Sequence, residues 1–185
     1  MTKIQQIATH IRKIPNYPKK GILFYDITTA LQDAETFQTI IDLMHENFAG
    51  QKIDAVVSLE ARGFILGAAL AYKLGVGFIP IRKKGKLPAA TLSEDYELEY
   101  GSATLEIHTD AIAKGQRVLI CDDLVATGGT MIAGANLIRN AGGIVAGACA
   151  LIEFSDMDGA NKVRDAGVDL FSLIQALGDM PRYNI

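Results

Sequence analysis

The sequence contains no tryptophan, only two cysteines and no surplus of basic residues. Its net charge is −3, whereas a protein whose main task is to wrap nucleic acid usually carries a basic excess. The cysteines, Cys121 and Cys149, form no CxxC or metal-ligand pattern, and each lies in an apolar run. We therefore expect no nucleic-acid partner, and buried thiols in a reducing compartment, the cytoplasm.

Long hydrophobic runs are missing as well. The longest apolar stretch, Gly142–Ile152, is much shorter than the roughly 20 residues of a membrane-spanning helix. Met1–Lys13 alternates apolar and polar residues, without the apolar core of a secretory signal. We expect neither a membrane partner nor a signal peptide. Two nucleotide-binding motifs are also absent: no GxGxxG occurs, and Pro80–Leu87 lacks the glycine and the Ser or Thr of a Walker motif.

Glycine, in contrast, is abundant, with 18 residues among 185. Hydrophobic residues make up 49% and charged residues 21%, values that exclude a disordered chain. The glycines have no three-residue period, so collagen is excluded too. The length suits one domain, residues 1–185. Glycine-rich loops allow the backbone to approach a ligand closely, so these loops are the first places to look for a site.

The hydrophobic pattern predicts an α/β protein. Isoleucines at helical spacing predict a first helix that runs through Ile14 and ends at Pro15, and Asp33 is a suitable N-cap for a second helix. Strands that alternate with helices form βαβ units, so we expect a mostly parallel central sheet flanked by helices, with ligands beyond the carboxyl ends of its strands. The expected extended segments are 22–26, 53–59, 76–81, 96–100, 103–108, 117–122, 144–153 and 168–173, and the later helices are 63–74, 130–140 and 157–166.

The strand predicted at 117–122 ends in two adjacent acids, Asp122 and Asp123, and a loop of small residues, Ala126–Thr130, then leads into a helix. Free backbone N–H groups at a helix N-terminus attract anions. Carboxylates accept hydrogen bonds from sugar hydroxyls or hold a hydrated Mg²⁺. The segment therefore predicts a site for a phosphorylated sugar. The alternative, a tight turn with a solvated acidic cap, leaves two acids without partners beside a buried strand, which is costly.

This segment, Val118–Thr130, resembles the phosphoribosyl-diphosphate motif of the type I phosphoribosyltransferases. The resemblance implies their fold: a mostly parallel central sheet flanked by helices, a small N-terminal hood (residues 1–32) and a flexible lid loop (residues 82–101). It implies that Asp122 and Asp123 bind the ribose hydroxyls. It also implies Mg²⁺ as cofactor, bound mainly through the substrate diphosphate and not directly by the protein. The residues implied to hold the 5′-phosphate are Ala126, Thr127, Gly128, Gly129 and Thr130.

A second segment, Glu60-Ala61-Arg62-Gly63, follows the strand predicted at 53–59. Gly63 permits close approach of an anion, and Arg62 offers a fork of donors suited to diphosphate. The resemblance makes this the diphosphate loop, with Arg62 in a catalytic role, and implies a strained cis peptide bond between Ala61 and Arg62. The alternative is an arginine at the start of a helix, where its charge is unfavourable.

A basic segment, Arg82–Lys86, contains four cations in five residues of an acidic protein, which favours a small polyanionic ligand. The resemblance implies that Arg82, Lys83 and Lys86 contact diphosphate. It further implies a homodimer in which Arg82 reaches the site of the partner subunit. A solvated basic loop is the alternative.

The long segment Leu87–Gly101 contains Glu99 and Tyr100 near its end, and its length predicts a mobile lid. The resemblance implies catalytic roles for both residues: Glu99 exchanges a proton with adenine N7, and Tyr100 helps to hold the diphosphate end. The alternation of Tyr96, Leu98 and Tyr100 equally fits an edge strand with Glu99 facing water.

The base site is expected around Phe24, whose ring can stack on a purine. The resemblance implies that backbone groups of Leu23 and Tyr25 read an adenine edge and that Leu124 forms the opposite wall. Phe24 as a core residue is the alternative. Tyr25 stands where the family often has a basic residue, a change that a contact through the main chain tolerates.

The likeness covers the chain from about Ile14 to Leu173 and is greatest to the family members that act on adenine. It implies an enzyme that converts adenine and phosphoribosyl diphosphate to AMP and diphosphate in purine salvage. One alternative is the same chemistry on hypoxanthine, guanine or xanthine. Another is a non-enzymatic regulator that senses phosphoribosyl diphosphate, although neither a helix-turn-helix segment nor an extra domain is visible.

Overall fold

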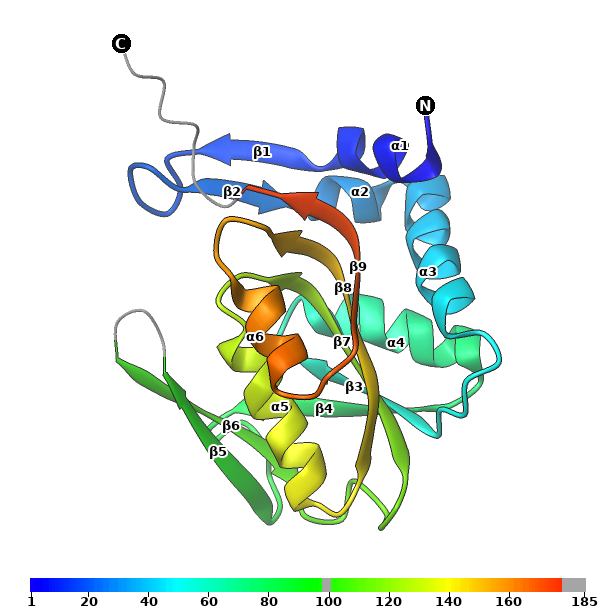
Figure 1. Ribbon diagram of the computed structural model, residues 1–185, viewed down its shortest axis with the longest axis vertical. Helices are drawn as coiled ribbons and strands as arrows, with labels where there is room; N and C mark the ends of the chain where they lie inside the picture. The colour runs from blue at the N-terminus through cyan, green and yellow to red at the C-terminus, as the bar shows by residue number, and fades with distance from the viewer. Residues whose placement is uncertain (98–100, 178–185) are drawn as a thin grey trace.

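The structure is a computed structural model and describes residues 1–97 and 101–177 (Figure 1). It contains a seven-stranded sheet in the order β5-β6-β4-β3-β7-β8-β9 and a separate two-stranded sheet, β1-β2. The elements, in chain order, are α1 (Lys3–His10), β1 (Arg12–Pro15), β2 (Leu23–Asp26), α2 (Thr28–Gln32), α3 (Ala34–Phe48), β3 (Ala55–Leu59), α4 (Gly63–Leu74), β4 (Gly77–Lys83), β5 (Thr91–Glu97), β6 (Ser102–His108), β7 (Arg117–Val125), α5 (Gly129–Asn140), β8 (Ile144–Phe154), α6 (Gly159–Asp165) and β9 (Leu170–Ala176).

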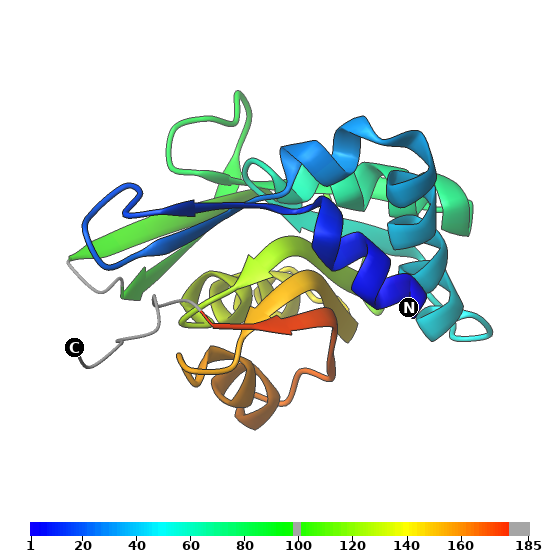
Figure 2. The ribbon, with the colours of Figure 1, turned by 90° about the horizontal axis from the view of Figure 1, so that it is seen from above.

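The large sheet is mostly parallel and covered on both faces, as predicted. Strands β4, β3, β7, β8 and β9 run parallel to one another, whereas β6 is antiparallel to both of its neighbours, β4 and β5. Helices α5 and α6 pack on one face, and α1, α3 and α4 pack on the other (Figure 2). Strand β3 is buried along its whole length, and its successive side chains, Val56 and Val57, enter the two opposite cores. The carboxyl ends of β3, β4 and β7 therefore meet at one edge.

The N-terminal hood differs from the sequence prediction in its first helix. Helix α1 ends at His10, and Ile14 lies in β1, where it pairs with Phe24 of β2. The helical prediction through Ile14 is wrong because the residue before a proline, here Pro15, is disfavoured in helical conformation and pairing with β2 is available instead. The short helix α2 was not predicted. Asp33 caps α3 as expected, since its carboxylate accepts the Thr36 N–H at 2.8 Å.

Most strands also differ in extent from the prediction, and the largest differences are in β5, β7 and β9, which was predicted at 168–173. Strand β7 continues to Val125 because its parallel pairing with β8 continues as far as Val125 and Glu153. Strand β5 begins at Thr91, and its register with β6 runs from Thr91–His108 to Glu97–Ser102. The remainder of the strand predicted at 96–100, including Glu99 and Tyr100, lies outside the described residues. No helix in the described part of the chain is long and apolar enough to cross a membrane.

Candidate active site

The acid pair lies near the carboxyl end of β7, where both side chains are buried. Asp122 Oδ1 accepts the backbone N–H of Asp123 at 2.8 Å. Burial raises the pKa of Asp122 well above its usual value, and the neighbouring charge of Asp123 raises it further. A nearby cation would therefore stabilise the charged form of these two carboxylates.

Arg62 supplies such a cation from the start of α4. Its Nε atom lies 2.7 Å from Asp123 Oδ2, and this guanidinium offsets part of the rise that burial causes in the Asp123 pKa. The same guanidinium lies over the Phe24 ring, 5.2 Å from its centroid, in cation–π geometry. The Arg62 side chain thus contacts two other predicted site residues, Asp123 of β7 and Phe24 of the hood.

The predicted phosphate turn joins β7 to α5. All of its residues except Gly129 line a cavity of about 170 Å³, together with Asp122, Leu124, Val125 and Met131. Gly128 has a φ of +81°, a conformation that a side chain rarely adopts, and among the described residues no side chain caps the helix that starts at Gly129. The N–H groups of the first turn are therefore left for an anion. Leu124, the predicted wall of the base site, borders the same cavity.

Two further segments enclose this turn. A Cβ atom on Gly128 would lie 2.6 Å from the Gly159 carbonyl oxygen at the start of α6, and one on Gly159 would collide with the Ala126 carbonyl oxygen. On another side, the Glu97 carbonyl oxygen lies 3.2 Å from the corresponding position at Gly129, and the Tyr96 ring lies 3.4 Å from it. Backbone of α6 and the end of β5 therefore form walls that the motif did not predict.

The basic segment contacts the arginine loop through Glu60, which the sequence analysis did not single out. The Glu60 carboxylate accepts two hydrogen bonds from the Arg82 guanidinium, each 3.2 Å long, and a third at 3.0 Å from the Lys83 backbone N–H. Arg82 lowers the pKa of Glu60. Arg82 also donates to the Lys86 carbonyl oxygen at 3.2 Å. The sequence did contain a signal for this contact: Glu60 directly follows β3, and Arg82 and Lys83 end the neighbouring parallel strand β4.

The non-proline cis peptide bond lies between Glu60 and Ala61, one bond before the predicted Ala61–Arg62 bond. That prediction is wrong in position. Neither bond precedes a proline, so nothing in the local sequence distinguishes them.

The backbone of β2 presents alternating groups to its two edges. The Asn16 N–H donates to the Ile22 carbonyl oxygen at 2.8 Å, which marks a hydrogen-bonded pair at the end of the two-stranded sheet. In an antiparallel pair, such positions alternate with non-hydrogen-bonded ones. With the observed register, Phe24 is hydrogen-bonded to β1, and the N–H and C=O groups of Leu23 and Tyr25 point to the other edge of β2.

That other edge pairs with no strand in the part of the chain that the structure describes. Phe24 is partly exposed and packs edge-on against Tyr17 at 5.1 Å, and it belongs to neither buried core of the described residues. The geometry therefore favours a ring available for stacking over a core residue. Leu23 and Tyr25 can offer donors and acceptors beside it.

Fold and site together define a phosphoribosyltransferase. The sequence model of a family described as "Phosphoribosyl transferase domain" matches residues 28–182. The chain is 58% identical over 174 residues to the adenine phosphoribosyltransferase of Neisseria meningitidis serogroup C, covering 94% of this chain and 93% of that one. It is 54% identical over 172 residues to that of Citrifermentans bemidjiense, covering 93% and 99%. The chain belongs to the adenine phosphoribosyltransferase family.

Solved structures agree with this assignment. The adenine phosphoribosyltransferase of Thermoanaerobacter pseudethanolicus is 52% identical, with a TM-score of 0.90 and coverage of 94% of this chain and 99% of that one. That of Saccharomyces cerevisiae, complexed with an imino-altritol bisphosphate and adenine, is 37% identical, with a TM-score of 0.87 and coverage of 93% and 98%.

Proposed function

We propose that the residues at the carboxyl ends of β3, β4 and β7, together with β2, convert adenine and phosphoribosyl diphosphate to AMP and diphosphate, the salvage reaction of the family. The observation that carries this assignment of roles is the Arg62 guanidinium, which lies between Asp123 and the Phe24 ring. It brings a sugar-binding acid, a diphosphate-binding cation and a base-stacking ring to one point.

The phosphate turn, residues 126–130, binds the 5′-phosphate through backbone N–H groups and the hydroxyls of Thr127 and Thr130. Asp122 and Asp123 accept hydrogen bonds from the two ribose hydroxyls. The uncapped start of α5 supports the first role, and the position of the acids beside that turn supports the second. Fixing the ribose at both ends leaves C1 as the free reacting centre.

The resemblance implies Mg²⁺ as cofactor, and the buried carboxylates of Asp122 and Asp123 offer oxygen atoms that a hydrated Mg²⁺ can contact. Among the described residues, no group of three or more His, Cys, Asp or Glu side chains could hold a metal ion. Mg²⁺ would therefore be bound mainly through the substrate diphosphate and not directly by the protein. When bound, the ion neutralises the diphosphate that leaves.

The diphosphate itself is bound by Arg62 and by the basic segment, for which we propose Arg82, Lys83 and Lys86. Glu60 keeps Arg82 and the Lys83 backbone next to the arginine loop. Cations from two parallel strands thereby converge on one anion, which stabilises the charge that develops on the leaving group.

Adenine binds with its edge on the backbone of Leu23 and Tyr25 and its face between Phe24 and Leu124. The open edge of β2 supports this placement. We further propose, from the resemblance of their motif, that Glu99 exchanges a proton with adenine N7 and Tyr100 helps to hold the diphosphate. Positioning and exclusion of water then favour the base over water as nucleophile at an oxocarbenium-like C1.

The test is an assay of the purified protein with a panel of bases, with and without Mg²⁺. We expect Mg²⁺-dependent formation of AMP and diphosphate from adenine. Equal or faster turnover of hypoxanthine, guanine or xanthine would contradict the adenine assignment. Binding of phosphoribosyl diphosphate without release of diphosphate with any base would support a regulator instead. Light scattering of the same preparation tests the homodimer that the Arg82 prediction requires.

A further inference from the structure

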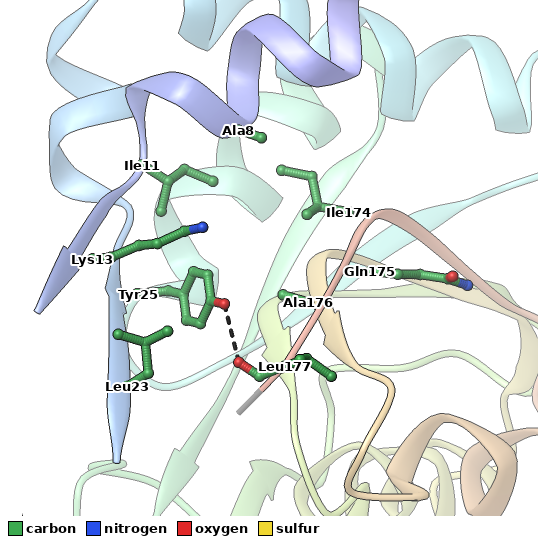
Figure 3. A pocket seen from close by; sticks show the side chains of 9 residues that line it. All are labelled: Ala8, Ile11, Lys13, Leu23, Tyr25, Ile174, Gln175, Ala176 and Leu177. Atoms are coloured by element: carbon green, nitrogen blue, oxygen red, sulfur yellow. Dashed lines mark hydrogen bonds between the residues drawn. The ribbon is translucent and has the colours of Figure 1, made fainter. Parts of the chain in front are cut away.

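A cavity of about 370 Å³ lies between the hood and the end of β9 (Figure 3). Tyr25 lines it, and neighbouring side chains of a strand point to opposite faces, so this cavity and Phe24 lie on opposite faces of β2. It is therefore separate from the proposed base site. Its lining residues are Ala8, Ile11, Lys13, Leu23, Tyr25, Ile174, Gln175, Ala176 and Leu177.

The Tyr25 side chain connects the two sheets across this cavity. Its hydroxyl donates to the Leu177 carbonyl oxygen at 3.0 Å, a contact that spans 152 positions of the sequence (Figure 3). Its ring lies 5.4 Å from that of Phe154, at the end of β8. The Lys13 ammonium of β1 lies 5.7 Å from the same ring. Tyr25 is only 8% exposed, and its contacts reach the ends of two strands of the large sheet.

The main chain of Tyr25 has a different task, since its N–H and C=O point to the open edge of β2 where we place adenine. The Tyr25 ring is held at its hydroxyl and by the ring of Phe154, and only two rotatable bonds join it to the main chain, so these contacts limit how far the backbone of β2 can shift. Loss of a contact would allow a displacement of the groups that face the base. The cavity leaves room for such a displacement.

We propose that Tyr25 is a positioning residue for the base: its side chain fixes β2 to the ends of β8 and β9 and so sets where the adenine-reading backbone lies. This inference rests on the proposed base site. In the proposed base site only the main chain of Tyr25 contacts adenine, and this inference adds a role for its side chain. The phosphate turn belongs to β7 and α5, so its position does not depend on this contact.

The test compares Tyr25→Phe with the parent enzyme. The variant keeps the ring and its contact with Phe154 but loses the hydroxyl. We expect the KM for adenine to rise about 3- to 10-fold, the range for loss of one neutral hydrogen bond. The KM for phosphoribosyl diphosphate and kcat should stay within about twofold. Tyr72→Phe removes the hydroxyl of a tyrosine on α4 that is 89% exposed; it is the matched control and should change neither KM nor kcat.

Two more variants make the outcome decisive. Phe154→Leu removes the ring contact of Tyr25 but leaves the Tyr25 hydroxyl in place. We expect it to raise the KM for adenine and not that for phosphoribosyl diphosphate. If Tyr25→Phe does not fold, Phe154→Leu tests the proposal in its place. Phe24→Ala tests the base site itself. An adenine KM that Phe24→Ala leaves unchanged would overturn the base site.

A large effect of Phe24→Ala with no effect of Tyr25→Phe would overturn the positioning role alone. A Tyr25→Phe variant that raises both KM values and lowers kcat together would also overturn it, since general loss of structure has that signature.

Discussion

The carboxylate of Asp122 occupies the space that any side chain on Gly63 would need. Asp122 Oδ1 lies 2.6 Å from the position of a Cβ atom on Gly63, and the Asp122 Cα atom lies 3.2 Å from it. The first residue of α4 and the acid of β7 are therefore packed so closely that the identity of one depends on the other.

Gly63→Ala is expected to displace Asp122 and weaken binding of phosphoribosyl diphosphate. An overpacked site costs about 1–3 kcal/mol of folding free energy, so the melting temperature should fall. The displaced Asp122 should also raise the KM for phosphoribosyl diphosphate by at least about tenfold, as loss of a charged hydrogen bond does. Steady-state kinetics and thermal unfolding measure the two effects. Gly77→Ala is the control, because nothing lies within 4 Å of a Cβ atom there and its backbone is not in the left-handed region. Equal behaviour of the two variants would contradict the contact.

Asp122→Asn is expected to stabilise the ligand-free protein at neutral pH. The pKa of Asp122 is higher in the folded chain than in the unfolded chain, so folding disfavours its charged form. At a pH below the pKa of about 4 that aspartate has in the unfolded chain, Asp122 is protonated in both the folded and the unfolded state, so Asp122→Asn is no more stable than the parent protein. As the pH rises above that value, the gain in melting temperature should grow.

Thermal unfolding between pH 4 and pH 8 tests this dependence, with Asp165→Asn at an exposed position of α6 as control. The same Asp122→Asn protein should bind phosphoribosyl diphosphate more weakly, by about 1.5–3 kcal/mol for a lost charged hydrogen bond. A variant that is stabilised yet binds with full affinity would refute the ribose assignment.

Glu60→Gln should loosen the basic segment. Glutamine can still accept the Lys83 N–H but gives up the charge that pairs with Arg82. We expect the KM for phosphoribosyl diphosphate to rise about 3- to 10-fold, because a charge-assisted pair becomes a neutral one, while the KM for adenine stays constant. Steady-state kinetics give both values, and Glu46→Gln on the surface of α3 is the control. A shift in the adenine KM alone would show that Glu60 acts elsewhere.

Local features of the site could be predicted from the sequence. The strand, acids and small residues of 117–130 form one continuous motif, and the limits of α4 and the Asp33 cap follow from neighbouring residues. Tyr25 with Leu177 could not be predicted, because the pair meets only after separate strands have assembled. For Glu60 with Arg82, the acid and the cations at the ends of two parallel strands were a signal, but the contact itself depends on the register of those strands. Ile14 shows the same limit: its spacing fits a helix, but a partner strand and the next residue, Pro15, decide its structure.

The contact between Gly128 and Gly159 limits how the phosphate site could be transplanted. The turn after β7 takes its shape partly from the backbone at the start of α6, which belongs to the next crossover of the sheet. If residues 118–130 alone were grafted into another α/β protein, the ligand-binding groups would be present, but the backbone of α6 against which the turn packs would be missing. The unit that would have to be moved is a pair of consecutive crossovers, β7–α5–β8–α6–β9, and not the motif alone.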